Sequence, residues 1–201
     1  MHCFVTAGAT IEPIDEVRHL SNHSTGRLGS HLADSLARAG HRVTLLLSQT
    51  ARHKPRSKQI RVNQFTTTHD LQEHMKAAAA LRVKAIFHVA AVSDFTIKKL
   101  PGKISSGAGL SLNLKPAPKI IRQLRKWHPS ALIVGWKYEA NGDRESALEA
   151  GSEQIRRCKT DGCVVNGPAY GDGFGWVTDT TEHLPNERAL FAQLKKFTSP
   201  R

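Results

Sequence analysis

Residues 21–29, "SNHSTGRLG", place small hydroxyl residues and two glycines directly ahead of a helix-like pattern. The first N–H groups of a helix and the positive end of its dipole favour an anion, and glycine lets a ligand approach the backbone closely. Ser24, Thr25 and Gly26 are therefore predicted to bind a phosphate, and Arg27 can pair with it. Two alternatives stay open from this stretch alone: a helix start without a ligand, and a dinucleotide-binding fingerprint.

The dinucleotide fingerprint is disfavoured by its context. It should follow the first strand almost at once, whereas the apolar run that predicts that strand ends at Ala7. The second predicted strand is followed by Ser48 and Gln49 rather than by an acidic residue. The two tyrosines, Tyr138 and Tyr170, also lack the lysine four residues later that a short-chain reductase would carry. We therefore expect no NAD(P) cofactor, although such a reductase remains an alternative.

Polar residues in the loop ahead of this stretch suit a carboxylate or phosphate ligand. Arg18 can bind either anion, and Asn22 can bind a carbonyl group. His19 and His23 lie four residues apart, but no third ligand is near in the sequence, so we expect no metal site made by protein ligands alone.

Two further segments carry candidate chemistry. In "AAVSDF" (90–95), Asp94 follows a buried strand, where it suits a ribose, a base or Mg²⁺; a turn aspartate is the alternative. In "PGKISSG" (101–107), Lys103 lies in a segment that can close over a polyphosphate, although a lone lysine is usually a surface residue.

Alternating strands and helices are predicted to position these residues. The expected strands and helices, in chain order, are strand 3–7, helix 26–40, strands 42–48 and 60–65, helix 69–80, strand 84–92, helix 118–127 with Pro118 in its first turn, strand 131–138, helix 143–158 capped by Asp143, strand 162–167, edge strand 173–179 and helix 186–197. Residues 9–25 are expected to form a loop, and 95–117 a long flap with at most one hairpin. This pattern predicts an α/β fold: a Rossmann-like three-layer αβα arrangement with a mostly parallel sheet and a flap after the fourth strand. Ligands of such folds bind beyond the carboxyl ends of the strands.

Bulk properties agree with a single domain over 1–201 that binds anionic small molecules. There are 29 Lys and Arg against 17 Asp and Glu, a formal net charge of +12. The densest basic run, "RHKPRSKQIR" (52–61), is predicted to be a solvated loop, so a nucleic-acid partner is not expected. Three cysteines without disulfide spacing, and no apolar run long enough for a membrane, predict a cytoplasmic protein that binds no membrane.

Six stretches, in order along the chain, resemble the phosphopantothenate–cysteine ligase family: "VTAGATIEPIDEVRHLSNHSTGRLG" (5–29), "AAVSDF" (90–95), "KISSG" (103–107), "LNLKPAPKII" (112–121), "IVGWKYE" (133–139) and "VVNG" (164–167). The sequence "SDF…KISS" is more similar to the stand-alone eukaryotic-type ligases than to the bacterial form fused to a flavin decarboxylase, so no flavin is expected. The resemblance implies a Rossmann-like homodimer. It also implies that 4'-phosphopantothenate is activated by CTP or ATP with Mg²⁺, forming an acyl-nucleotide that reacts with cysteine.

The resemblance also implies roles for particular residues. Asn22 would hold the acyl intermediate, Arg18 would belong to the same site, and Lys103 would stabilise the reacting phosphates. Ser24, Thr25 and Gly26, with Arg27 beside them, would take phosphate groups. The implied nucleotide-binding residues are Gly8, Ala90, Ala91, Val92, Asp94, Lys103, Pro118, Lys119, Ile120, Ile121 and Trp136, which stands where the family has Phe.

Some positions depart from the bacterial pattern. Gln154 and Cys158 stand where bacterial members have lysines that face the triphosphate, and Arg156 or Lys119 could supply the charge instead. These departures leave open the choice between CTP and ATP. They also leave open a diverged homologue that binds nucleotide or nucleic acid without catalysis.

Overall fold

A computed structural model describes residues 1–105, 107 and 109–198. Ser106, part of the "KISSG" stretch, and Ala108 lie outside the described residues. The central sheet has eight strands in the order β12-β11-β10-β9-β6-β1-β4-β5. Its strands are β1 (His2–Ala7), β4 (Arg42–Ser48), β5 (Arg61–Phe65), β6 (Ala85–His88), β9 (Leu132–Tyr138), β10 (Gly162–Asn166), β11 (Phe174–Val177) and β12 (Thr181–Leu184). The six strands from β5 to β10 are parallel, and β11 and β12 are antiparallel, which confirms the predicted fold class.

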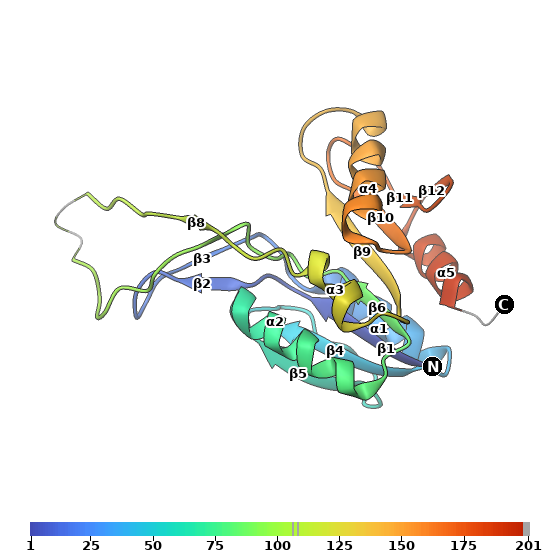
Figure 1. The fold of residues 1–201 in the computed structure, drawn as a ribbon, viewed down its shortest axis with the longest axis horizontal. Coiled ribbons are helices and arrows are strands. Elements are labelled where there is room, and N and C mark those ends of the chain that lie inside the picture. The colour runs from blue at the N-terminus through green and yellow to red at the C-terminus, as the bar shows by residue number, and fades with distance from the viewer. Residues whose placement is uncertain (106, 108, 199–201) are drawn as a thin grey trace.

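Helices cover both faces of the sheet (Figure 1). The helices are α1 (Arg27–Arg38), α2 (Thr68–Ala77), the short 3₁₀ helix η1 (Ala78–Leu81), α3 (Ile121–Trp127), α4 (Arg144–Cys158) and α5 (Glu187–Thr198). Leu32 and Leu36 of α1 share one buried cluster with Leu190 of α5. Leu71 of α2 and Leu124 of α3 belong to another cluster.

The side chains of strand β10, which alternate between the two faces of the sheet, show that α4 lies on the same face as α2 and α3. Val164 packs in the cluster of α1 and α5, whereas Cys163 and Val165 pack with Ala147 of α4. Because successive side chains of a strand point to opposite faces, α1 and α5 cover one face and α2, α3 and α4 the other. No helix in the described part of the chain is long and apolar enough to cross a membrane.

Two small hairpins extend from the sheet as one arm (Figure 1). They are β2 (Ile11–Pro13) with β3 (His19–Ser21), and β7 (Phe95–Thr96) with β8 (Lys115–Pro116). We call residues 11–21 and 95–116 the arm. Its two parts are joined by backbone hydrogen bonds from Leu100 N to Ile14 O (2.8 Å) and from Glu16 N to Gly102 O (3.2 Å). The flap is therefore fastened to the turn of the first hairpin.

Most predicted elements are confirmed, including the Asp143 cap of α4, which forms a capping box with Ser146. Four expectations about the elements are wrong. Residues 9–25 contain the β2–β3 hairpin, and the strand expected over 84–92 ends at His88. The helix expected from Pro118 begins at Ile121. Strand β11 is not at the edge, because β12 pairs with it on the outside.

Candidate functional site

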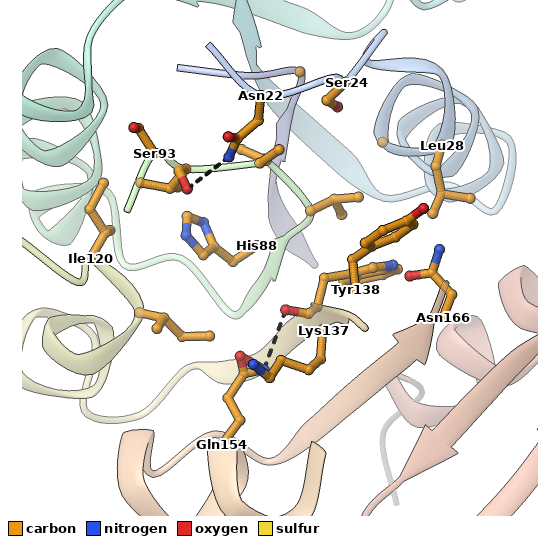
Figure 2. A pocket seen from close by; sticks show the side chains of 18 of the residues that line it. Asn22, Ser24, Leu28, His88, Ser93, Ile120, Lys137, Tyr138, Gln154 and Asn166 are labelled. Atoms are coloured by element: carbon orange, nitrogen blue, oxygen red, sulfur yellow. Dashed lines mark hydrogen bonds between the residues drawn. The ribbon is translucent and has the colours of Figure 1, made fainter. Parts of the chain in front are cut away.

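A cavity of about 950 Å³ opens at the carboxyl ends of β1, β6 and β9. The chain runs outward from β1 to β4 and β5 and then returns to β6 on the other side of β1, so the order of the strands reverses there. That reversal is where open α/β sheets bind ligands. Figure 2 shows side chains from both sides of the sheet pointing into this space.

Most of the predicted site residues line this cavity: Gly8, Asn22, Ser24, Thr25, Gly26, Arg27, Ala90, Ala91, Val92, Asp94, Lys119, Ile120, Ile121 and Trp136. Arg18, Lys103 and Pro118 do not. Arg18 and Lys103 lie on the arm, where Arg18 Nη2 donates to Ile104 O (2.8 Å). A single chain thus brings together the loop before α1, the strand ends and the start of α3. Arg18 and Lys103 stay outside this cavity.

The start of α1 forms one wall and is built around two glycines. Gly26 is the N-cap at φ +76°, and no side chain caps the helix there. A Cβ on Gly29 would lie 2.5 Å from the Cβ of Ala7, so only glycine lets α1 approach β1 this closely. The first N–H groups of α1 therefore face the cavity without a capping side chain, which suits an anion.

Asn22 and Arg27 flank this helix start. Asn22 Nδ2 donates to Val92 O (3.2 Å), which joins the loop before α1 to the turn after β6 (Figure 2). The Arg27 guanidinium lies 2.5 Å from the Glu187 carboxylate of α5. Arg27 can therefore reach an anion at the helix start only by sharing its charge with Glu187.

The turn after β6 carries Asp94, whose carboxylate pairs with the ammonium group of Lys119. Both side chains are about half exposed, so the pair lies at the cavity rim, where water screens it. Since each is a charged group at the mouth of the cavity, either can turn to a ligand when the pair opens.

His88, the last residue of β6, lies on the cavity floor and is buried. Its Nδ1 lies 3.1 Å from Thr6 Oγ1, and Thr6 Oγ1 also accepts from Ala90 N (3.1 Å). Burial lowers the pKa of His88 from 6.5 to about 4, so the imidazole is neutral at neutral pH.

The wall made by α3, α4 and β9 is cationic. Arg122, Lys137 and Arg157 line it around Cys158. Burial raises the pKa of the Cys158 thiol, and the positive charges of these three residues act in the opposite sense. Lys137 pairs with Glu139 (2.8 Å) and Arg157 with Glu153 (2.5 Å), whereas Arg122 has no ion pair among the described residues.

Arg156 and Lys119 were the residues expected to supply positive charge near α4. Arg157, rather than the predicted Arg156, lines the cavity, and Lys119 lines it as expected. Gln154 is turned inward instead of presenting a charge: its Nε2 donates to Trp136 O (3.4 Å) and lies 3.0 Å from Cys163 Sγ.

Sequence reasoning missed His88 and Arg122 as lining residues. Tyr138 and Asn166 also line the cavity, and both end their strands, where the rule for parallel sheets predicts ligand-binding residues. His88 was hidden because the apolar run continues to Val92, four residues beyond the end of the strand. Arg122 carries no local signal, because only the packing of α3 beside α4 directs it to this wall.

Comparison with known proteins identifies the family. Residues 1–196 match the family described as DNA/pantothenate metabolism flavoprotein C-terminal domain. The chain belongs to this family. The resemblance expected from the motifs is therefore confirmed.

Two relatives and one solved structure illustrate the match. The coenzyme A biosynthesis bifunctional protein CoaBC of Thermococcus kodakarensis is 35% identical over 164 residues, which cover 81% of this chain and 40% of that protein. Phosphopantothenate–cysteine ligase 1 of Arabidopsis thaliana is 23% identical, with 81% of this chain and 68% of that protein covered. The DNA/pantothenate metabolism flavoprotein of Streptococcus pneumoniae has the same fold, with a TM-score of 0.87, 24% identity, and 98% and 97% of the two chains covered. The chain thus spans less than half the length of the bifunctional relative.

Proposed function

We propose that residues 1–201 act as one domain that joins 4'-phosphopantothenate and L-cysteine to give 4'-phosphopantothenoylcysteine, a step of coenzyme A biosynthesis, using CTP or ATP. One observation carries the proposal. In a chain of this family, the start of α1, which no side chain caps, and a separate cationic wall on α3 and α4 face one cavity. Two phosphate-bearing substrates need two such regions.

The chemistry has two steps. The carboxylate of phosphopantothenate attacks the α-phosphorus of the nucleotide, so an oxygen–phosphorus bond forms while the bond to pyrophosphate breaks. The cysteine amine then attacks the acyl carbon, nucleoside monophosphate leaves, and the nitrogen loses a proton. Activation is required because a carboxylate oxygen is a poor leaving group until it carries a phosphate.

Asn22 and the helix start are assigned to the acyl substrate. Asn22 is anchored on Val92 O at the junction of the two halves of the cavity, where an amide can hold the carbonyl group of the acyl intermediate. Ser24, Thr25 and Gly26 offer hydroxyl and backbone donors for a phosphate group.

The α3–α4 side is assigned to the nucleotide. Arg122, Lys137 and Arg157 supply positive charge there, and Ala90, Ile120 and Ile121 supply apolar contacts. Asp94 and Glu153 offer carboxylate oxygens, which fit Mg²⁺ because this ion takes one or two carboxylates and otherwise binds phosphates and water. When bound, Mg²⁺ would offset the charge of the phosphates.

A homodimer is part of the proposal, and it gives Lys103 and Arg18 a place. Both lie on the arm, and neither lines the cavity of its own chain. Val17 and Phe95, also on the arm, are 60% and 47% exposed. A second copy that covers these apolar residues would receive the arm, and its cavity would receive Lys103.

The test is a pyrophosphate-release assay with the purified chain. We expect release that requires both phosphopantothenate and the nucleotide, with CTP and ATP compared side by side, and an amide product only when cysteine is added. Nucleotide binding without pyrophosphate release would instead support a non-catalytic homologue.

A further inference from the structure

On the α3–α4 side of the sheet, two uncharged polar side chains, His88 and Gln154, line the cavity near Gly135. His88 is the register partner of Gly135 on the neighbouring strand β9. A Cβ on Gly135 would lie 2.8 Å from both Ile121 Cδ1 and Gln154 Nε2. Because paired residues of adjacent strands point to the same face, His88 and Gln154 are neighbours across a position without a side chain. Figure 2 shows both among the side chains that line the cavity.

The hydrogen bonds of His88 make it a donor toward the cavity. Thr6 Oγ1 already accepts from Ala90 N, and Thr6 is fully buried, so its hydroxyl proton needs an acceptor. His88 Nδ1 is the acceptor within reach, at 3.1 Å. The proton of the neutral ring then sits on Nε2, which has no hydrogen-bond partner among the described residues.

Gln154 complements this donor. Its Nε2 is held by Trp136 O and Cys163 Sγ, which fixes the amide and leaves Oε1 as an acceptor without a partner in the described part of the chain. A donor and an acceptor therefore face the same cavity from either side of Gly135, with Ile121 beside Gln154. Gln154 Oε1 is an acceptor and so does not suit a phosphate, whose charge Arg122, Lys137 and Arg157 of the same wall can balance.

We propose that His88 and Gln154 read the hydrogen-bonding edge of the nucleobase and select a base that carries an amino group. This inference rests on the proposed function, because it assigns the nucleotide to this side of the cavity. Cytosine and adenine each present a ring nitrogen acceptor beside an amino donor, which match His88 Nε2–H and Gln154 Oε1. Uracil and hypoxanthine present N–H beside C=O, so in the same orientation of the base each group would face its like.

The test compares two pairs of nucleotides whose bases differ only at this edge: ATP with ITP, and CTP with UTP. Calorimetric titration of the wild-type chain should show at least one amino-bearing nucleotide binding about 10- to 100-fold more tightly than its keto counterpart, because two hydrogen bonds are mismatched in the latter. Gln154→Leu and His88→Phe should each reduce that ratio about 3- to 10-fold. His128→Gln is the matched control: His128 is also buried, but its Nε2 contacts Met75 O, and it does not line the cavity.

A spectroscopic measurement distinguishes a hydrogen bond from His88 to the base from a purely structural role of His88. In ¹⁵N-histidine spectra, His88 should show the Nε2–H tautomer without ligand, and its Nε2 signal should move with ATP or CTP but not with inorganic pyrophosphate. The Nδ1–H tautomer would overturn the assignment.

The remaining outcomes are decisive as well. Equal binding of amino- and keto-bearing nucleotides, or variants that keep the wild-type ratio, would overturn the inference and leave the proposed function intact. Variants that weaken phosphopantothenate binding but spare the nucleotide would show that the pair contacts the acyl substrate instead. A wild-type chain that binds no nucleotide would refute both proposals.

Discussion

His88 should make the stability of the protein depend on pH in a defined window. Burial lowers its pKa from 6.5 to about 4. Between these two pH values His88 is therefore mostly protonated in the unfolded chain and mostly neutral in the folded chain. The contribution of neutral His88 is complete above pH 6.5 and is lost as the pH falls toward 4. A difference of this size corresponds to about 3 kcal/mol of unfolding free energy.

The perturbation is His88→Phe, which keeps an aromatic ring and removes the titration. Urea unfolding of both chains at pH 7.5, 6, 5 and 4.5 gives the unfolding free energy at each pH. The variant loses the contact with Thr6 at every pH, which displaces its curve by a constant amount. The informative quantity is therefore the slope of the unfolding free energy against pH. Below pH 6.5 this slope should be smaller in the variant than in the wild type.

Other histidines with lowered pKa values do not obscure this comparison. Burial also lowers the pKa of His2, His41 and His128, but these groups are present in both proteins and cancel in the difference. Parallel curves for wild type and variant between pH 6.5 and 4.5 would refute the reasoning, because they would mean that His88 titrates equally in the folded and unfolded chains.

Further predictions concern the helix start, the arm and the acyl site. Gly29→Ala should destabilise the fold by about 1–3 kcal/mol because its Cβ meets β1, whereas Gly109→Ala, with no atom within 4 Å, should change the melting temperature little. Asp15→Asn should speed hydrogen exchange in the flap, because the Asp15 carboxylate accepts from three backbone N–H groups, one of them in the flap; unchanged exchange would show that this contact is dispensable. Asn22→Ala should still release pyrophosphate but form little amide, and Lys103→Gln should lower the rate of pyrophosphate release at least about tenfold. Mixing these last two variants should restore part of the amide formation if Lys103 acts across a dimer, and no recovery would place it in its own subunit.

The fold was largely predictable because its signals are local. Apolar runs, Gly40 after α1 and Asp143 before α4 each act over one or two helical turns. The β2–β3 hairpin was missed because it has only three residues per strand and is held by distant partners. Thr68 N, for example, donates to Glu12 across 56 residues (3.1 Å).

The candidate site was predictable where it follows the chain and unpredictable where it depends on packing. Residues after strands, such as Ala90 and Asp94, could be found from the rule that parallel strands end at one edge. The position of Gln154 against Gly135 could not, because it depends on the absence of a side chain at Gly135 and on the packing of α4 against β9. No window of the sequence contains that information.

The arm shows how the cavity and the assembly are linked. A flap fastened along the first hairpin by Asp15 and by backbone hydrogen bonds cannot fold back freely onto its own sheet. The same fastening holds Val17 and Phe95 in water, which is unfavourable for large apolar side chains. In a two-fold symmetric pair, an arm that leaves one body meets the other, and the exchange is reciprocal. The proposed homodimer would thus bury the apolar residues of the arm and place its cations near the phosphates with a single contact.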